Sequence, residues 1–338
     1  MRKDKTFIVA ELSSNHCRKK SIIKDTIKAA KDSGADAFKI QTFDLDHMTL
    51  NVRNQRYQNK EGLWKGYYHY DLYKEIQLPW EWHEMIFEEC EKSGLVCFST
   101  PFDINSVLFL EKLNNPIYKI ASSEISFLPL LEYVSKLRKP ILFSTGVATE
   151  DDIYSAIDTI SKNNKDIIIL KCTSSYPTPL EDSNILSIRT LKEKFGYDIG
   201  LSDHTHGHSA AVAAVANGAK VIEKHFILNK SIESADSSFS MTPDSFSQMT
   251  KEIRNIEKVL GSSHIEQKHL LDKSRFHMRS IFSIKKIKKG EIFTDDNIRI
   301  MRPNIGLSPK YYKKLLGSFA KNDIDENMPI DISDVEIL

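Results

Sequence analysis

Short apolar runs alternate with longer amphipathic segments over the first 261 residues of the chain. Eight of these runs are six to eight residues long, which is the ordinary length of a β-strand. They begin at Phe7, Asp36, Leu95, Ile117, Pro140, Asp166, Asp198 and Ala219. Each run stays apolar along most of its length, and this is typical of strands that are buried on both faces.

The segments between the runs have the spacing of amphipathic helices. Residues 21–34 place Ile23, Ile27 and Ala30 on one face, and both this segment and residues 79–94 end at a glycine, a common helix stop. Buried strands that alternate with helices of this length predict parallel βαβ units. Eight such units favour an α/β fold of the (β/α)8 type, a TIM barrel. A doubly wound open sheet is the alternative, and the number of units argues against it.

The chain divides into three parts. Residues 1–261 contain the eight predicted units, and the last predicted helix covers residues 245–261. Residues 262–277 are polar and have no strand pattern, so they predict a linker helix or arm. Residues 278–338 show alternation and a Lys-Lys-Gly-Glu turn but no long helix. They predict a small, mostly β domain of a size that is only marginally stable alone.

Charge and cysteine content exclude several classes of protein. The 47 Lys and Arg residues nearly balance the 46 Asp and Glu residues, which argues against a general nucleic-acid binder. No apolar run is long enough to span a bilayer, and the apolar stretch near the N-terminus is too short for a signal peptide. The cysteines lie far apart, without a CxxC pair, so we expect a cytoplasmic protein without disulfides and without a membrane partner. They are Cys17, Cys90, Cys97 and Cys172.

The segment between Thr42 and Pro79 is rich in aromatic residues. They are Tyr57, Trp64, Tyr67, Tyr68, Tyr70 and Tyr73. In a barrel this segment would follow the second strand, on the face where the loops after the strands build the active site. Aromatic rings with polar tips suit a sugar, but the same rings could simply pack a long loop. The sequence leaves both interpretations open.

Polar residues occur at or just beyond the ends of the predicted strands. They are Glu11, Lys39, Gln41, Thr100, Lys119, Ser122, Glu124, Ser144, Lys171, Ser202, His204, Glu223 and His225. A barrel brings all of its strand ends to one rim, so these residues would converge although they are far apart in sequence.

Lys39 and Lys119 are the most informative members of this set. Burying a lysine beside apolar strands is costly unless its ammonium group meets an anion. For either lysine alone, an ion pair with Glu11 or Glu124 is the simpler explanation. The two lysines together with several nearby hydroxyl groups favour a site for a phosphate or a carboxylate.

Two histidines follow the seventh and eighth predicted strands at matching positions. Neighbouring strands lie about 4.8 Å apart, so the imidazoles of His204 and His225 could share one metal ion. Neutral imidazole suits a first-row dication such as Mn²⁺ or Zn²⁺. Asp203 immediately precedes His204 and Glu223 lies two residues before His225, so both carboxylates are candidates to support these ligands.

Several motifs occur in an order that resembles a known family. They are AELSSNH, KIQT, FSTPFD, YKIASSE, STGVAT, LKCTSSYPTP, GLSDHTHG, VIEKHF and RPNIGLSP. Over essentially the whole chain they are similar to the N-acylneuraminate (sialic acid) synthase family, whose members condense phosphoenolpyruvate with an amino sugar. The tail resembles the antifreeze-like (SAF) domain of that family.

Other segments are most similar to the pseudaminic acid synthase branch of the family. These segments are LYKEIQLPWEWH, LKCTSSYP, ADSSFSM and PNIGLSPKYY. Sialic and legionaminic acid synthases usually have a DHKAS-like stretch where this chain has DSSFS, from Asp236 to Ser240. The chain also has Ser123 where sialic acid synthases commonly have glycine, and Ser174 where some relatives have asparagine. Both departures fit a changed sugar pocket.

The resemblance implies a role for each candidate residue. The implied catalytic residues are Glu11, Glu124, His204 and His225. His204 and His225 would also bind a divalent cation, Mn²⁺ first, with Mg²⁺ or Co²⁺ as alternatives. The residues implied to bind phosphoenolpyruvate are Lys39, Thr100, Lys119, Ser122, Ser144 and Ser202. Those implied to bind the acetamido sugar are Gln41, Tyr176, Asp236 and Arg302. In this family the tail covers the barrel mouth of the partner subunit, which implies a domain-swapped homodimer.

Three functions compete at this point. The first is the synthase, with N-acetylneuraminate and legionaminic acid synthases as alternatives within the family. The second is another phosphoenolpyruvate-dependent aldol enzyme of the same barrel type that acts on a sugar phosphate. The tail and the lack of a second basic cluster argue against it. The third is a non-catalytic carbohydrate-binding or ice-binding protein, which the set of lysines and histidines disfavours. The exact sugar, the physiological metal, the binding order and the glutamate that moves the proton stay open.

Overall fold

Eight parallel strands hydrogen-bond side by side into a closed barrel in the computed structural model, which describes residues 5–266 and 268–336. The strands are β1 (Phe7–Glu11), β2 (Ala37–Thr42), β3 (Val96–Pro101), β4 (Tyr118–Ile120), β5 (Ile141–Ser144), β6 (Ile167–Cys172), β7 (Asp198–Asp203) and β8 (Val221–His225). Strand β1 pairs with both β2 and β8, and this closes the sheet. The predicted TIM barrel is confirmed, and the open-sheet alternative is excluded.

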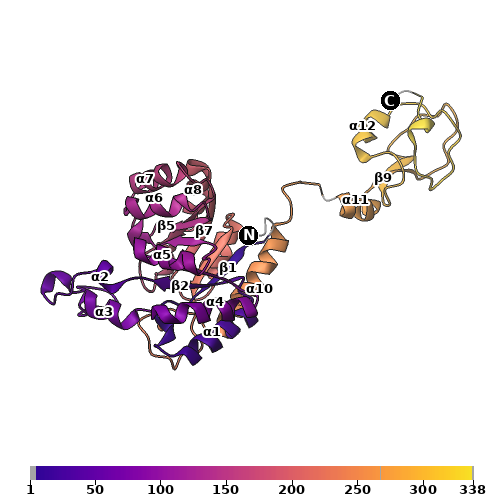
Figure 1. Cartoon of the computed structure of the whole chain (residues 1–338). Helices are drawn as coiled ribbons and strands as arrows, with labels where there is room; N and C mark the ends of the chain where they lie inside the picture. Colours follow the sequence, from indigo (N-terminus) through magenta and orange to yellow (C-terminus); the bar gives the residue numbers. More distant parts are fainter. Residues whose placement is uncertain (1–4, 267, 337–338) are drawn as a thin grey trace. The chain divides into compact units, whose positions relative to one another are not determined.

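Helices surround the strands, as Figure 1 shows. The helices of this unit are α1 (Lys20–Asp32), α2 (Leu45–Met48), α3 (His69–Ile76), α4 (His83–Lys92), α5 (Ile104–Lys112), α6 (Leu128–Lys136), α7 (Glu150–Ser161), α8 (Ser187–Phe195), α9 (Ser209–Ala216) and α10 (Pro243–Leu260). Short 3-10 turns are η1 (Ser13–His16), η2 (Gln55–Tyr57), η3 (Trp80–Trp82), η4 (Ser122–Glu124) and η5 (Leu180–Ser183). Local sequence explains several boundaries. Helix α7 starts with a capping box between Thr149 and Asp152, and α1 ends just before Gly34, whose φ of +85° suits glycine.

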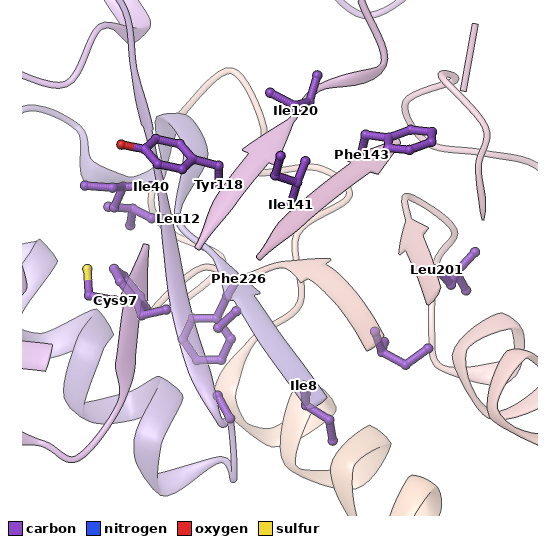
Figure 2. Close-up of a cluster of buried hydrophobic side chains, with 14 of the residues drawn as sticks. Ile8, Leu12, Ile40, Cys97, Tyr118, Ile120, Ile141, Phe143, Leu201 and Phe226 are labelled. Atoms are coloured by element: carbon purple, nitrogen blue, oxygen red, sulfur yellow. The ribbon is translucent and has the colours of Figure 1, made fainter. Parts of the chain in front are cut away.

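The outer faces of the strands pack against the helices. Ile8, Ile40, Phe143 and Leu201 lie in one large apolar cluster that also includes helical residues such as Ile23. Figure 2 shows part of this cluster, with Phe226 next to the strands. Because side chains alternate along a strand, the residues between these positions point into the barrel.

The inner face of the barrel has an apolar lower part. Its buried side chains are Phe7, Val9, Ala37, Phe98, Ile117, Leu142, Ile168, Leu170 and Val221. Gly200 occupies the corresponding place on β7, where an added Cβ would lie 2.7 Å from the Val221 carbonyl oxygen. This tight packing makes the lower half a solid floor, so a ligand can enter the barrel only from the carboxyl ends of the strands.

A long segment follows β2 before the chain returns to α4. It contains α2, η2 and α3, and the helices α2 and α3 stand apart from the ring of barrel helices in Figure 1. Residues 58–68 form a small hairpin within it, with an antiparallel bridge between Gln58 and Tyr68. This hairpin lies in the segment that the sequence marks as aromatic.

The chain divides into two compact units, Met1–Gly261 and Ser262–Leu338. The second unit contains α11 (Lys268–Ser274), η6 (Arg275–His277), β9 (Ser280–Ser283), β10 (Ile298–Met301), η7 (Pro309–Tyr311), α12 (Tyr312–Leu315) and η8 (Ile332–Asp334). Strands β9 and β10 are antiparallel, and isolated bridges such as Ile287 with Ile324 add to them. The unit has its own core, which includes Ile281, Phe293 and Leu315. Among the described helices, none is both long enough and apolar enough to cross a membrane.

Candidate active site

The inner face of the barrel changes from apolar to polar toward the carboxyl ends of the strands. There it surrounds a pocket that is open to solvent. The predicted site residues that line it are Glu11, Lys39, Gln41, Thr100, Lys119, Ser122, Ser144, Tyr176, Ser202, His204 and His225. Phe102, Ala121, Cys172 and Glu223 complete the wall. Most of these residues continue the inward-pointing positions of the strands, so the period-two alternation itself brings them together.

Four buried charges form the centre of the pocket. The Lys39 ammonium lies 2.7 Å from Glu11 Oε2 and 3.6 Å from Glu223 Oε1. The Lys119 ammonium lies 3.7 Å from the same Glu223 oxygen. Two lysines therefore face two glutamates, and each charge has an opposite charge beside it. Within the strand register, Glu11 is level with Lys39 on β2 and with His225 on β8.

These contacts shift the pKa of each group. Burial raises the pKa of Glu11, and the nearby Glu223 adds to this effect while Lys39 opposes it. Burial also opposes ionisation of Glu223, but Lys119 and Lys39 outweigh it and lower the pKa of that carboxyl. The pKa of Lys39 is raised because Glu11 and Glu223 outweigh its burial, whereas burial lowers the pKa of Lys119. Of the four, Glu11 and Lys119 are therefore the groups best suited to proton transfer.

Hydroxyl groups surround the two lysines. Lys39 donates to Thr100 Oγ1 at 3.1 Å, and Ser202 donates to Glu223 Oε1 at 3.2 Å. The Ser122 hydroxyl accepts from the Gly146 amide at 2.9 Å. The buried Ser144 hydroxyl has no hydrogen-bond partner among the described residues. We call the six residues Lys39, Thr100, Lys119, Ser122, Ser144 and Ser202 the anion-binding cluster, after the role that the sequence predicts for them.

The two histidine rings lie side by side at the top of the pocket, with centroids 5.3 Å apart. His204 Nδ1 lies 3.0 Å from the Thr173 carbonyl oxygen, which can only accept, so in the neutral ring Nδ1 carries the proton and Nε2 keeps its lone pair. The buried Nδ1 of His225 has no hydrogen-bond partner among the described residues. Burial, together with His204 and Lys39, holds the pKa of His225 well below its usual range.

This histidine pair can supply two ligands to a divalent cation. Both rings have a nitrogen available, and one of them is oriented by a backbone carbonyl, as is usual for metal-binding histidines. Within residues 5–266 and 268–336, no group of three or more His, Cys, Asp or Glu side chains is arranged to hold a metal ion.

Asp236 lies next to the histidines without lining the pocket. Its Oδ2 accepts from the backbone amide and the hydroxyl of Ser14, at 3.1 and 2.8 Å, and lies 4.0 Å from His225 Nδ1. The neighbouring Asn15 donates to the Phe226 carbonyl oxygen and to Ser240 Oγ, both at 2.8 Å. The turn after β1 therefore fixes the segment after β8 that carries Asp236.

Asp203 does not support either histidine, contrary to the sequence-based expectation. Its Oδ2 accepts from the Lys224 ammonium at 2.6 Å, and Lys224 also donates to the Thr205 carbonyl oxygen at 2.6 Å. Asp203 and Lys224 each stand one position along the strand from a pocket residue on β7 or β8, so their side chains point away from the pocket. They form a buried ion pair that joins the two strands just before the histidines.

Two other predicted residues lie outside the pocket wall. Glu124 is in η4, close to the wall, and burial raises the pKa of its carboxyl. Arg302 is in the second unit, and its sugar contact stays a prediction. Sequence reasoning missed Cys172 and Phe102 as wall residues. The alternation Ile168, Leu170, Cys172 along β6 could have identified the cysteine.

Comparisons with known proteins fit this architecture. The NeuB family matches residues 26–265, and the SAF domain matches residues 279–336. The chain belongs to the NeuB family. The described barrel is therefore the NeuB part of an enzyme chain, followed by a SAF domain.

Individual relatives refine this assignment. A pseudaminic acid synthase from Campylobacter jejuni serotype O:2 is 45% identical, over 95% of this chain and 94% of the relative. An N,N'-diacetyllegionaminic acid synthase from the same strain is 35% identical, over 96% of this chain and 98% of the relative. Among solved structures, a putative spore coat polysaccharide biosynthesis protein E from Chromobacterium violaceum is similar with a TM-score of 0.81. That likeness covers 98% of this chain and 100% of the other, at 27% identity.

The Asp203–Lys224 pair gives a stability prediction for this NeuB-family barrel. Lys224→Met leaves the Asp203 carboxylate buried without its cation, so it should lower the free energy of unfolding by about 3–5 kcal/mol. Adding Asp203→Leu should restore part of the loss because it removes the uncompensated charge. Denaturant titration of the single and double variants measures both effects. The control is Lys220→Met, which removes an exposed lysine near the start of β8. A single variant as stable as this control would contradict the prediction.

Proposed function

We propose that the chain is a pseudaminic acid synthase, a transferase. It would condense phosphoenolpyruvate with 2,4-diacetamido-2,4,6-trideoxy-L-altrose and water, with C–O bond cleavage, to give pseudaminic acid and phosphate. The single observation that carries this proposal is the meeting of the anion-binding cluster and the histidine pair in one pocket. The greater identity to the pseudaminic than to the legionaminic acid synthase of one Campylobacter strain supports the choice of sugar.

The anion-binding cluster suits phosphoenolpyruvate. Lys39 and Lys119 supply two buried positive charges, and a phosphate or carboxylate can replace Glu223 as their partner. The Ser144 hydroxyl, which has no hydrogen-bond partner among the described residues, is available to donate to an anionic oxygen. Gly146 has no side chain, and this leaves room for the Ser122 hydroxyl, which would lie 2.9 Å from an added Cβ. A ligand with both a phosphate and a carboxylate would use both lysines at once.

The histidine pair suits a divalent cation, Mn²⁺ first and Mg²⁺ or Co²⁺ as alternatives. His204 and His225 would hold it, because each has a ring nitrogen available inside the pocket. When bound, the cation supplies a Lewis acid that polarises the aldehyde oxygen of the opened sugar.

The glutamates handle charge and protons in this mechanism. As C3 of phosphoenolpyruvate attacks the aldehyde carbon, positive charge develops at C2, and the carboxylate of Glu11 or Glu124 can stabilise it. Water then adds at C2, and phosphate leaves with its bridging oxygen. Burial raises the pKa of both carboxyls, which favours proton exchange near neutral pH. Gln41 donates to Glu11 Oε1 at 3.0 Å and orients that carboxylate.

The sugar side of the pocket would be formed by Gln41, Tyr176 and Asp236, with Arg302 contributed by the SAF domain of a partner subunit. This arrangement makes the active enzyme a domain-swapped homodimer, and we propose that it works in the cytoplasm. A sialic or legionaminic acid synthase is the second candidate, since the legionaminic relative is also similar over nearly its whole length. The sugar that the enzyme prefers distinguishes these two candidate functions.

A panel of acetamido sugars tests the reaction directly. The enzyme should prefer the 6-deoxy diacetamido sugar to N-acetylmannosamine, by up to about 10⁴-fold in kcat/KM, because a mismatched polar group leaves a buried partner unpaired. Phosphate release gives the rates, and mass spectrometry should detect a nine-carbon 2-keto acid. A higher kcat/KM for N-acetylmannosamine would assign the chain to another branch of the family.

Removal of the metal should abolish turnover. Chelator treatment should stop phosphate release, and added Mn²⁺ should restore it. His204→Ala and His225→Ala should each be inactive and lose bound metal, with an unchanged unfolding temperature. The control is His206→Ala, which changes an exposed histidine of the same segment and should stay active. Full activity of the metal-stripped protein would exclude the cation.

Arg302→Ala should impair the use of sugar much more than that of phosphoenolpyruvate. Hydrogen bonds to a charged donor contribute about 1.5–3 kcal/mol, so the KM for sugar should rise by about one to two powers of ten. Arg299→Ala, an exposed arginine of β10, is the control. In a verified heterodimer, an Arg302→Ala subunit and a His204→Ala subunit should together rebuild one working site. No recovered activity would show that the SAF domain serves its own barrel.

A further inference from the structure

The hairpin of residues 58–68, which we call the Trp64 hairpin, is fastened to the barrel by one side chain. Its own strands are held by backbone bonds between Asn59 and Tyr67 and between Gly66 and Asn59, both 2.9 Å long. From residue 60 to residue 67 every side chain is exposed except Trp64, which is half-buried. In the described chain, the bond from Trp64 Nε1 to the Ala235 carbonyl oxygen, 3.1 Å, is the hydrogen bond that ties residues 60–66 to the rest of the barrel.

Trp64 joins two other segments that face the pocket. Its ring lies 5.4 Å from that of Tyr176, in the loop after β6, at a tilt of 49°. Its hydrogen-bond acceptor Ala235 immediately precedes Asp236, in the segment after β8. A single indole therefore contacts Tyr176 itself and the residue before Asp236, and these are two of the three barrel residues proposed to bind the sugar.

Tyr176 transmits this contact to the histidines. Its ring lies 4.2 Å from His204 and 5.3 Å from Phe239, and Phe239 lies 4.8 Å from His225. Tyr176 lines the pocket, whereas Trp64 does not. Trp64 thus packs against the tyrosine without being part of the pocket wall.

We propose that Trp64 is a positioning residue for the sugar side of the pocket. It holds Tyr176 over the histidines and holds the Ala235–Asp236 segment beside them. The anion-binding cluster comes from the inner face of the strands and the turn after β4, and among the described residues no hydrogen bond or ion pair joins it to the hairpin. Trp64 should therefore govern affinity for the acetamido sugar and leave affinity for phosphoenolpyruvate unchanged. This inference rests on the proposed function.

The test compares steady-state constants for Trp64→Ala, Trp64→Phe and the control Leu63→Ala. Leu63 is in the same turn and 44% exposed, so its loss should change nothing. Trp64→Ala should raise the KM for sugar about tenfold, because an aromatic contact and a hydrogen bond are both lost. The KM for phosphoenolpyruvate and kcat should stay within about twofold. Trp64→Phe keeps a ring against Tyr176 but loses the hydrogen bond to Ala235. It should therefore show about half of the increase in log KM for sugar that Trp64→Ala shows.

The possible outcomes separate this inference from the proposed function. A wild-type protein that turns over no acetamido sugar overturns both. A wild-type protein that is active, with Trp64→Ala unchanged in its KM for sugar, overturns the role of Trp64 alone. So does an equal rise in both KM values, or a fall in kcat without a change in the KM for sugar. A selective rise that Trp64→Phe partly reverses supports the proposal.

Discussion

The buried charges of Glu11, Lys39, Lys119 and Glu223 are the constraint on which the rest of the site depends. Taking four ions out of water costs several kcal/mol each, and only mutual contact at short distance offsets this cost. The barrel provides that contact because it fixes the four strands from which they project, β1, β2, β4 and β8. The arrangement is also incomplete by itself: Glu223 shares one oxygen between two lysines, while its second oxygen has no hydrogen-bond partner in the described chain. Such a group of charges is well prepared to exchange a carboxylate partner for an anionic ligand.

The pairing of β8 with β1 closes the barrel and completes the rim of the pocket. Because these are the last and first strands, residues more than 200 positions apart must be held together there. Ser14 and Asn15 do this through side-chain bonds to Asp236, Ser240 and the Phe226 carbonyl group. These contacts thereby keep the Asp236 carboxylate 4.0 Å from His225 Nδ1.

Much of this could be predicted from the sequence, for a physical reason. A strand that is buried on both faces is mostly apolar, because a buried polar side chain without a partner is costly. Lys39, Lys119 and His225 therefore stood out in the sequence as candidates to meet a ligand. The role of Asp203 was harder to predict, because one position along a strand decides whether a side chain faces the pocket or the helices. The Trp64 contact could not be predicted at all. It depends on where the long segment between β2 and α4 folds back, and no periodic pattern encodes that position.

The proposed site takes its residues partly from strands and partly from loops, and this affects how the specificity of such an enzyme can evolve. The anion-binding cluster comes mainly from strands, and any shift there would disturb the closed sheet. Tyr176, Asp236 and Trp64 are carried by connections after β6, β8 and β2, which can vary in length and sequence while the sheet stays intact. On the proposed assignment of the sugar side of the pocket to these connections, mutations there would change the choice of sugar while the phosphoenolpyruvate site is preserved. The fold would then separate a reaction fixed by the sheet from a specificity that the loops can adjust.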